Sequence, residues 1–143
     1  MALLVVHLAA VWFLVGLVWM VQVLVYPGFA AVGARDGWRD HHDRHTRLMG
    51  LVVTGPWAVQ GVTTAWLLVN RPDGVGLGLV ATAAACGVVT VAVTVAVSVP
   101  CHRRLSGGYD AAVLRRLVVT NWWRTAAWTL GGVVAALMVL SAH

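Results

Sequence analysis

Histidines are the most versatile side chains in this sequence, and three of them are candidates for a shared site. His42 and His45 lie three residues apart in a short polar segment, so on a helix they would share a face. His102 follows Pro100 in a second polar segment. Imidazole acts as a general base and also binds Cu, Fe or Zn. The three histidines are therefore predicted as catalytic residues and as ligands of a transition metal, the alternative being a solvated, charged segment.

Other polar side chains lie inside or beside long apolar runs, where polar groups are costly and are functional candidates by default. Gln22 and Tyr26 are four residues apart and share a helical face. Tyr26 is a candidate proton-transfer group, with an interfacial anchor as the alternative. Gln60 is a candidate substrate-binding residue, with hydrogen bonding between helices as the alternative.

Arg124 is the most unusual of these residues, because all five acidic residues lie outside the apolar runs. It can extend to the interface, pair with a loop carboxylate, or hold an anionic or phenolate ligand together with Asn121 and Trp128 on a similar face. The lack of intramembrane carboxylates excludes a carboxylate-rich di-iron bundle. A stripe of small polar residues in the third apolar run either lines a cavity or bonds its own helix carbonyls: Thr82, Cys86, Thr90, Thr94 and Ser98.

The elements that must position these residues are four apolar runs, at 3–26, 48–69, 75–99 and 117–140. Of the 143 residues, 60% are apolar and only 10% are charged, with a mean hydropathy of +0.83. Each run is long enough to cross about 30 Å of hydrocarbon. The sequence predicts an all-α, integral membrane four-helix bundle that forms a single domain over 1–143.

Two connections are predicted to contain helix. Asp36 is expected to cap a helical extension that leads through the histidine segment into the second span, where Pro56 would kink it. After Gly107 and Gly108, another helix is expected to start near Tyr109 and Asp110.

The arginines indicate an orientation in the membrane. Eight of them lie in the first and third connections and one in the second: Arg35, Arg39, Arg44, Arg47, Arg103, Arg104, Arg115 and Arg116 against Arg71. The positive-inside rule predicts a multi-pass cell-membrane protein with these two connections in the cytoplasm and both termini outside. The net charge of +5 is thereby explained by the orientation of the protein in the lipid bilayer, and we expect no nucleic-acid partner.

Short motifs resemble a group of small, mostly uncharacterised bacterial membrane proteins, the anthrone oxygenase-like family. The resemblance covers most of the chain and is carried by Gln22-x-x-x-Tyr26-Pro27, Trp38-x-x-x-His42-x-x-His45, Pro56-x-x-x-Gln60, Pro100-x-His102 and Asn121-Trp122-x-Arg124-Thr125. An acid often occupies the family position that Gln60 takes here.

The resemblance implies a membrane-embedded tailoring enzyme for a small aromatic or phenolic substrate of natural-product biosynthesis. The reaction would be an oxidation or a related step such as nitrogen–nitrogen bond formation, at the cytoplasmic face. It further implies that Trp122, Trp123 and Trp128 stack on the substrate, Arg124 stabilises a phenolate and a histidine takes the phenolic proton. The alternatives are a non-catalytic metal-binding protein, or a structural or transport partner subunit; a homo-oligomer is compatible with each.

Overall fold

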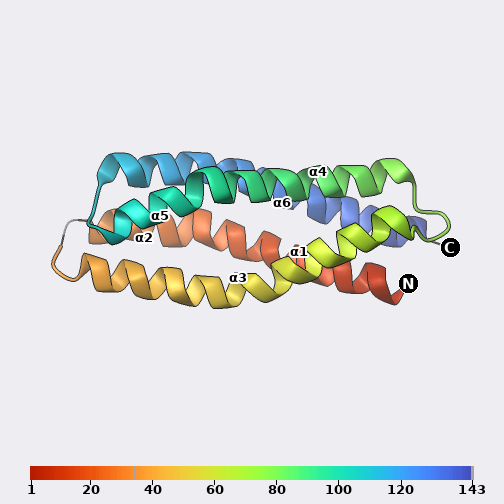
Figure 1. The fold of residues 1–143 in the computed structure, drawn as a ribbon, viewed down its shortest axis with the longest axis horizontal. Helices are drawn as coiled ribbons and strands as arrows, with labels where there is room; N and C mark the ends of the chain where they lie inside the picture. The colour runs from red at the N-terminus through yellow and green to blue at the C-terminus, as the bar shows by residue number, and fades with distance from the viewer. Residues whose placement is uncertain (34, 143) are drawn as a thin grey trace.

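Four long helical rods lie side by side in the computed structural model, which describes residues 1–33 and 35–142 (Figure 1). The first rod consists of α1, a π-helical segment η1 and α2, and the third of α4, a second π-helical segment η2 and α5. The bounds are α1 Ala2–Met20, η1 Val21–Val25, α2 Tyr26–Val32, α3 Trp38–Val69, α4 Leu77–Val93, η2 Thr94–Ser98, α5 Val99–Ser106 and α6 Ala111–Ser141.

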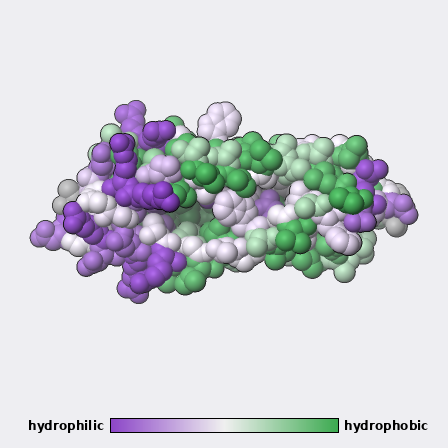
Figure 2. All heavy atoms as spheres, viewed as in Figure 1, coloured by the Kyte–Doolittle hydropathy of each residue, from purple (hydrophilic) through white to green (hydrophobic). Residues whose placement is uncertain are grey.

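Each of the four rods is long and apolar enough to span a membrane: Ala2–Val32, Trp38–Val69, Leu77–Ser106 and Ala111–Ser141. The predicted all-helical fold with four apolar spans is therefore confirmed, and it is the architecture of a multi-pass membrane protein. Hydrophilic residues gather at the end of the bundle that carries residues 33–47 and 101–116, which we name the Arg-rich end (Figure 2). Both termini lie at the opposite end (Figure 1).

The prolines at the ends of the first and third apolar runs do not end the helices. Pro27 and Pro100 each lie at the start of an α-helix that directly follows a π-helical segment. Proline cannot donate the backbone hydrogen bond of a regular helix, and the wider π-helical turn takes up this local mismatch. The rods thus continue for another turn or more beyond each proline, so His102 lies on ordered helix.

Helix α3 begins one residue later than the sequence predicts. Gly37, at φ 89°, occupies the N-cap position and makes no side-chain cap hydrogen bond, so the expected cap by Asp36 is wrong. The start of this helix is held against α5 by Trp38 instead. The Trp38 indole donates a hydrogen bond to the Leu105 carbonyl oxygen at 2.8 Å. The predicted extension itself is confirmed, and α3 bends in its middle part, where Pro56 lies (Figure 1).

The start of α6 agrees with the prediction. Asp110 is its N-cap, and one carboxylate oxygen accepts hydrogen bonds from the backbone N–H groups of Ala112 and Val113, at 2.9 and 3.0 Å. This cap satisfies two of the backbone donors that a helix start leaves without an intrahelical partner.

Helices α1 and α6 form the most buried part of the bundle, whereas α3 and α4 face mostly outward. The two central helices approach closely at Gly132, where a Cβ would lie 3.2 Å from Val15 Cγ2. Two apolar clusters close the ends: one around Phe29, Trp38 and Leu117, the other around Leu4 and Met138. The polar residues occupy the length of bundle between them.

Candidate functional site

Arg124 of α6 is the centre of a polar network inside the bundle. One guanidinium nitrogen, Nη1, donates to Asn121 Oδ1 at 3.1 Å and to Ser98 Oγ at 3.4 Å. The Asn121 amide in turn donates to Gln22 Oε1 at 2.8 Å, and Gln22 Nε2 donates to the Val118 carbonyl oxygen at 3.4 Å. Gln22 and Ser98 both belong to the π-helical segments, so these segments supply the polar partners of the arginine.

The second span enters the network through Gln60. Its Oε1 accepts a hydrogen bond from the Trp128 indole at 3.0 Å, and both residues are buried. The Arg124 guanidinium carbon lies 5.1 Å from the centroid of the Trp128 ring, within cation–π range. All four spans therefore contribute side chains around one cation, and Gln60 acts by holding the indole in place.

Within residues 1–33 and 35–142, the cation in this network has no carboxylate at ion-pair distance. Its neighbours are neutral dipoles and an aromatic face, and Arg124 Nε is buried without a hydrogen-bond partner in the described part of the chain. Tyr26 lines the same pocket as Arg124. Of the alternatives for Arg124, pairing with a loop carboxylate is therefore absent from this structure.

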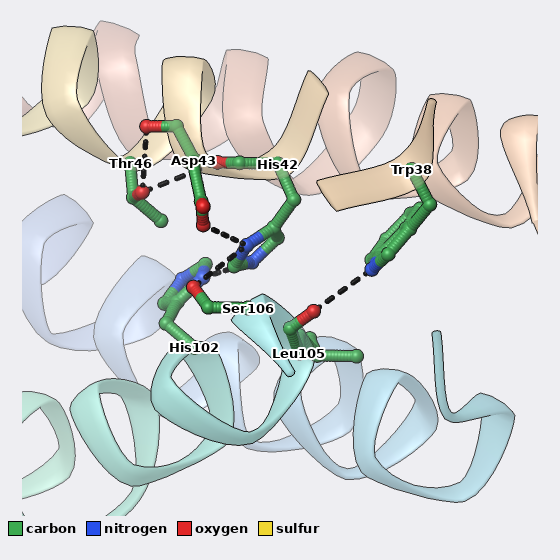
Figure 3. A network of polar contacts seen from close by, with 7 residues as sticks. All are labelled: Trp38, His42, Asp43, Thr46, His102, Leu105 and Ser106. Carbon is green, nitrogen blue, oxygen red and sulfur yellow. Dashed lines mark hydrogen bonds and ion pairs between the residues drawn. The ribbon is translucent and has the colours of Figure 1, made fainter. Parts of the chain in front are cut away.

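The histidines form a second polar group, between α3 and α5. His42 Nε2 and His102 Nδ1 lie 3.1 Å apart, as a hydrogen-bonded pair, and His42 is fully buried. The other nitrogen of His42, Nδ1, lies 3.3 Å from Ser106 Oγ and 3.6 Å from a carboxylate oxygen of the exposed Asp43 (Figure 3). The His45 ring stacks near that of His102, with centroids 6.2 Å apart.

The metal site predicted from His42, His45 and His102 stays a prediction. In this structure His42 and His102 hydrogen-bond to one another. Residues 1–33 and 35–142 contain no group of three or more His, Cys, Asp or Glu side chains arranged to hold a metal ion.

A pocket of about 400 Å³ joins the two polar groups. The surface is hollowed between α3 and α5 beside the hydrophilic end, so the pocket is open on the side of the bundle (Figure 2). Apolar side chains of α1 and α3 form most of its wall. Its polar lining includes Tyr26, His45, Ser98, His102, Ser106 and Arg124, together with a second arginine, Arg103, and with Thr46, Thr54 and Thr94. Trp128 also lines the pocket.

The predicted site residues thus divide into two sets. The wall of the pocket contains five of them: Tyr26, His45, His102, Arg124 and Trp128. The other four are buried behind the wall and hold it in place: Gln22, His42, Gln60 and Asn121. The Tyr26 side chain is only 2% exposed, so the alternative interpretation of this residue as an interfacial anchor is wrong.

The resemblance was misleading for two tryptophans. Trp122 and Trp123 are exposed and do not line the pocket, so the expected stacking on a substrate is wrong for both. Sequence reasoning also missed Ser106 and Trp57, which line the pocket. For Trp57, the sequence signal that could have identified it was its position directly after Pro56, where the second span was expected to kink. In the polar stripe, Thr82, Thr90, Thr94 and Ser98 all bond carbonyl oxygens of their own helix, as the more conservative interpretation predicted. Thr94 and Ser98 also line the pocket, so the cavity-lining interpretation holds for these two residues.

Comparison with protein-family models, with curated proteins and with solved structures found no match to this chain.

The absence of an anionic partner predicts that Arg124 lowers the stability of the fold. We expect Arg124→Gln to leave the free energy of unfolding unchanged or to raise it by about 1–2 kcal/mol, because the variant no longer buries an unpaired charge. Asn121→Ala is the contrast: it leaves buried polar groups of Gln22 and Arg124 without partners and is expected to cost about 1–3 kcal/mol. Unfolding of the purified variants by SDS in mixed micelles measures both changes. A loss on Arg124→Gln as large as that on Asn121→Ala would instead make the arginine a structural residue.

Proposed function

We propose that this protein is a membrane-embedded enzyme that binds a small phenolic or otherwise acidic aromatic molecule, with the anionic oxygen of the ligand at Arg124. The observation that carries the proposal is a cation in the pocket wall, Arg124, which has no carboxylate within ion-pair distance in the described part of the chain. A phenolate oxygen in the pocket supplies the missing negative charge. The apolar wall and the Trp128 ring suit the aromatic body of such a ligand.

His102 is the proposed general base, because its ring lies in the wall of the pocket and is oriented from behind. For its Nε2 to accept a proton, its Nδ1 must donate to His42 Nε2. His42 Nδ1 then carries a hydrogen directed at Ser106 Oγ and the Asp43 carboxylate, both of which can accept it. His42 is thus a positioning residue that selects the reactive tautomer of His102. Arg124 stabilises the phenolate that the proton transfer produces.

The resemblance to anthrone oxygenase-like proteins supports an oxidation as the following step. In that reaction the electron-rich phenolate reacts with dioxygen: a ring methylene becomes a carbonyl, and one molecule of water leaves with the second oxygen atom. The arginine distribution supports a cytoplasmic location of the Arg-rich end. Both termini would then lie outside the cell, and we expect an alkaline phosphatase fused to the C-terminus to be active there.

Binding of the anion can be tested with 4-nitrophenol, whose absorbance reports its own ionisation. Next to the guanidinium, the bound probe is expected to ionise about one pH unit lower than the free probe, because an adjacent cation favours the phenolate. A pH titration of the probe with purified protein in detergent measures this change. Arg124→Gln should abolish it, and Arg71→Gln, which removes an arginine at the opposite end of the bundle, should preserve it. Equal behaviour of the two variants would contradict anion binding at Arg124.

Catalysis is tested by the aerobic conversion of an anthrone to the anthraquinone in membranes that contain the protein. His102→Gln is expected to lower kcat by about 100-fold or more, the usual contribution of a general base. His41→Gln is the matched control, because His41 is exposed and does not line the pocket. Arg124→Gln should raise KM as well. If His102→Gln keeps the wild-type kcat, the proposed base is wrong, whereas the nitrophenol result would still establish the anion site.

A further inference from the structure

A second hollow lies at the Arg-rich end, between α5 and α6, with a volume of about 500 Å³. We name it the α5–α6 groove. Its floor is apolar, formed by Ala96, Val97, Pro100, Cys101 and Val113, and its rim carries Arg103, Arg104 and Arg116. The groove therefore has a cationic part and an apolar part next to each other.

The three rim arginines are exposed and uncompensated. None of them lies within ion-pair distance of a carboxylate in the described part of the chain, where the one such contact joins His42 and Asp43. Asp110 is near in sequence, but its carboxylate caps the start of α6. Three unpaired guanidinium groups around one hollow attract a ligand with negative charge, and their planar donors suit a phosphate in particular.

The position of the groove along the helices matches the boundary between headgroups and acyl chains. Counted from Leu77 at the opposite end, Val97 lies about 30 Å along its rod and Arg104 about 40 Å, at 1.5 Å per residue. Arg116 lies about 38 Å from Ser141, counted along α6 in the same way. With hydrocarbon about 30 Å thick, the inner part of the floor, at Ala96 and Val97, lies at the edge of the acyl chains, and the arginines lie among the headgroups.

We propose that the α5–α6 groove binds the headgroup of an anionic phospholipid from the leaflet at the Arg-rich end. The arginines contact the phosphodiester, and an acyl chain of the same molecule lies along the apolar floor. A zwitterionic lipid carries its own cation next to the phosphate, so it offers the three arginines less net charge. Basic hollows between transmembrane helices recognise anionic headgroups in this way. The groove does not include Arg124, although Arg103 lines both hollows, and the lipid proposal does not depend on the proposed enzymatic activity.

The test is a titration of the purified full-length protein in neutral detergent with short-chain phosphatidylglycerol, and in parallel with phosphatidylcholine of the same chain length. Thermal unfolding midpoints report binding. Phosphatidylglycerol is expected to raise the midpoint at lower concentration than phosphatidylcholine. The double variant Arg104→Gln/Arg116→Gln should weaken the apparent affinity for phosphatidylglycerol about 30-fold, equivalent to about 2 kcal/mol for two arginines near the membrane surface.

Two control variants distinguish this groove from general surface charge and from misfolding. Arg44→Gln/Arg115→Gln removes the same charge from exposed residues of the same end that do not line the groove, and it should retain most of the affinity. Arg104→Lys/Arg116→Lys keeps the charge and should retain more affinity than the glutamine pair. An equal loss in the two glutamine pairs overturns the proposal, as does equal affinity for the two lipids. Stabilisation by inorganic phosphate at the same concentrations would instead assign a free anion as the ligand.

Discussion

The burial of one guanidinium group without a counter-ion is the constraint on which the rest of this structure depends. A cation inside a membrane bundle is costly unless dipoles are directed at it, and here each span supplies part of that environment. Gln22 orients Asn121, Ser98 accepts directly, and Gln60 holds the indole that faces the cation. Because these partners are neutral, they reduce the cost of the charge without cancelling it. The residual positive potential is what a ligand of this pocket would meet.

The two π-helical segments explain how neutral side chains from separate helices reach the same point. Each contributes one polar residue to the network and is followed within two residues by a proline. A wider turn changes the rotational position of every residue after it, so it separates the faces that the two halves of a rod present. One half packs in the bundle through apolar residues, and the other carries Tyr26 or His102 to the pocket. Local helix geometry therefore couples the membrane fold to the site.

The sequence was sufficient for the coarse fold, because hydrophobic length and the need to satisfy backbone hydrogen bonds leave few alternatives in a bilayer. It also identified Arg124, since an intramembrane charge is conspicuous by residue type alone. It could not indicate which polar residues line the pocket and which hold the wall. That distinction depends on how each helix is rotated about its axis. A π-helical turn changes this rotation for every residue that follows it, and the sequence does not reveal where such a turn occurs. Trp122 and Trp123 illustrate the point: they adjoin Arg124 in sequence but are exposed on the outside of α6.

The arginines of this protein act in two different physical environments, and the difference bears on the interpretation of Arg124. Arg104 and Arg116 are exposed at the Arg-rich end, where water and salt screen them. Arg124 Nε is buried and Nη1 donates to two fixed acceptors, and an anion that binds this residue must leave water and fit a 400 Å³ pocket. Shape and the capacity to exist as a dehydrated anion then select the ligand, and a phenol meets both conditions: it enters the membrane neutral and becomes charged only where a base removes its proton. Because His102 and Arg124 lie in the same pocket wall, removal of the phenolic proton and stabilisation of the phenolate can take place at one site.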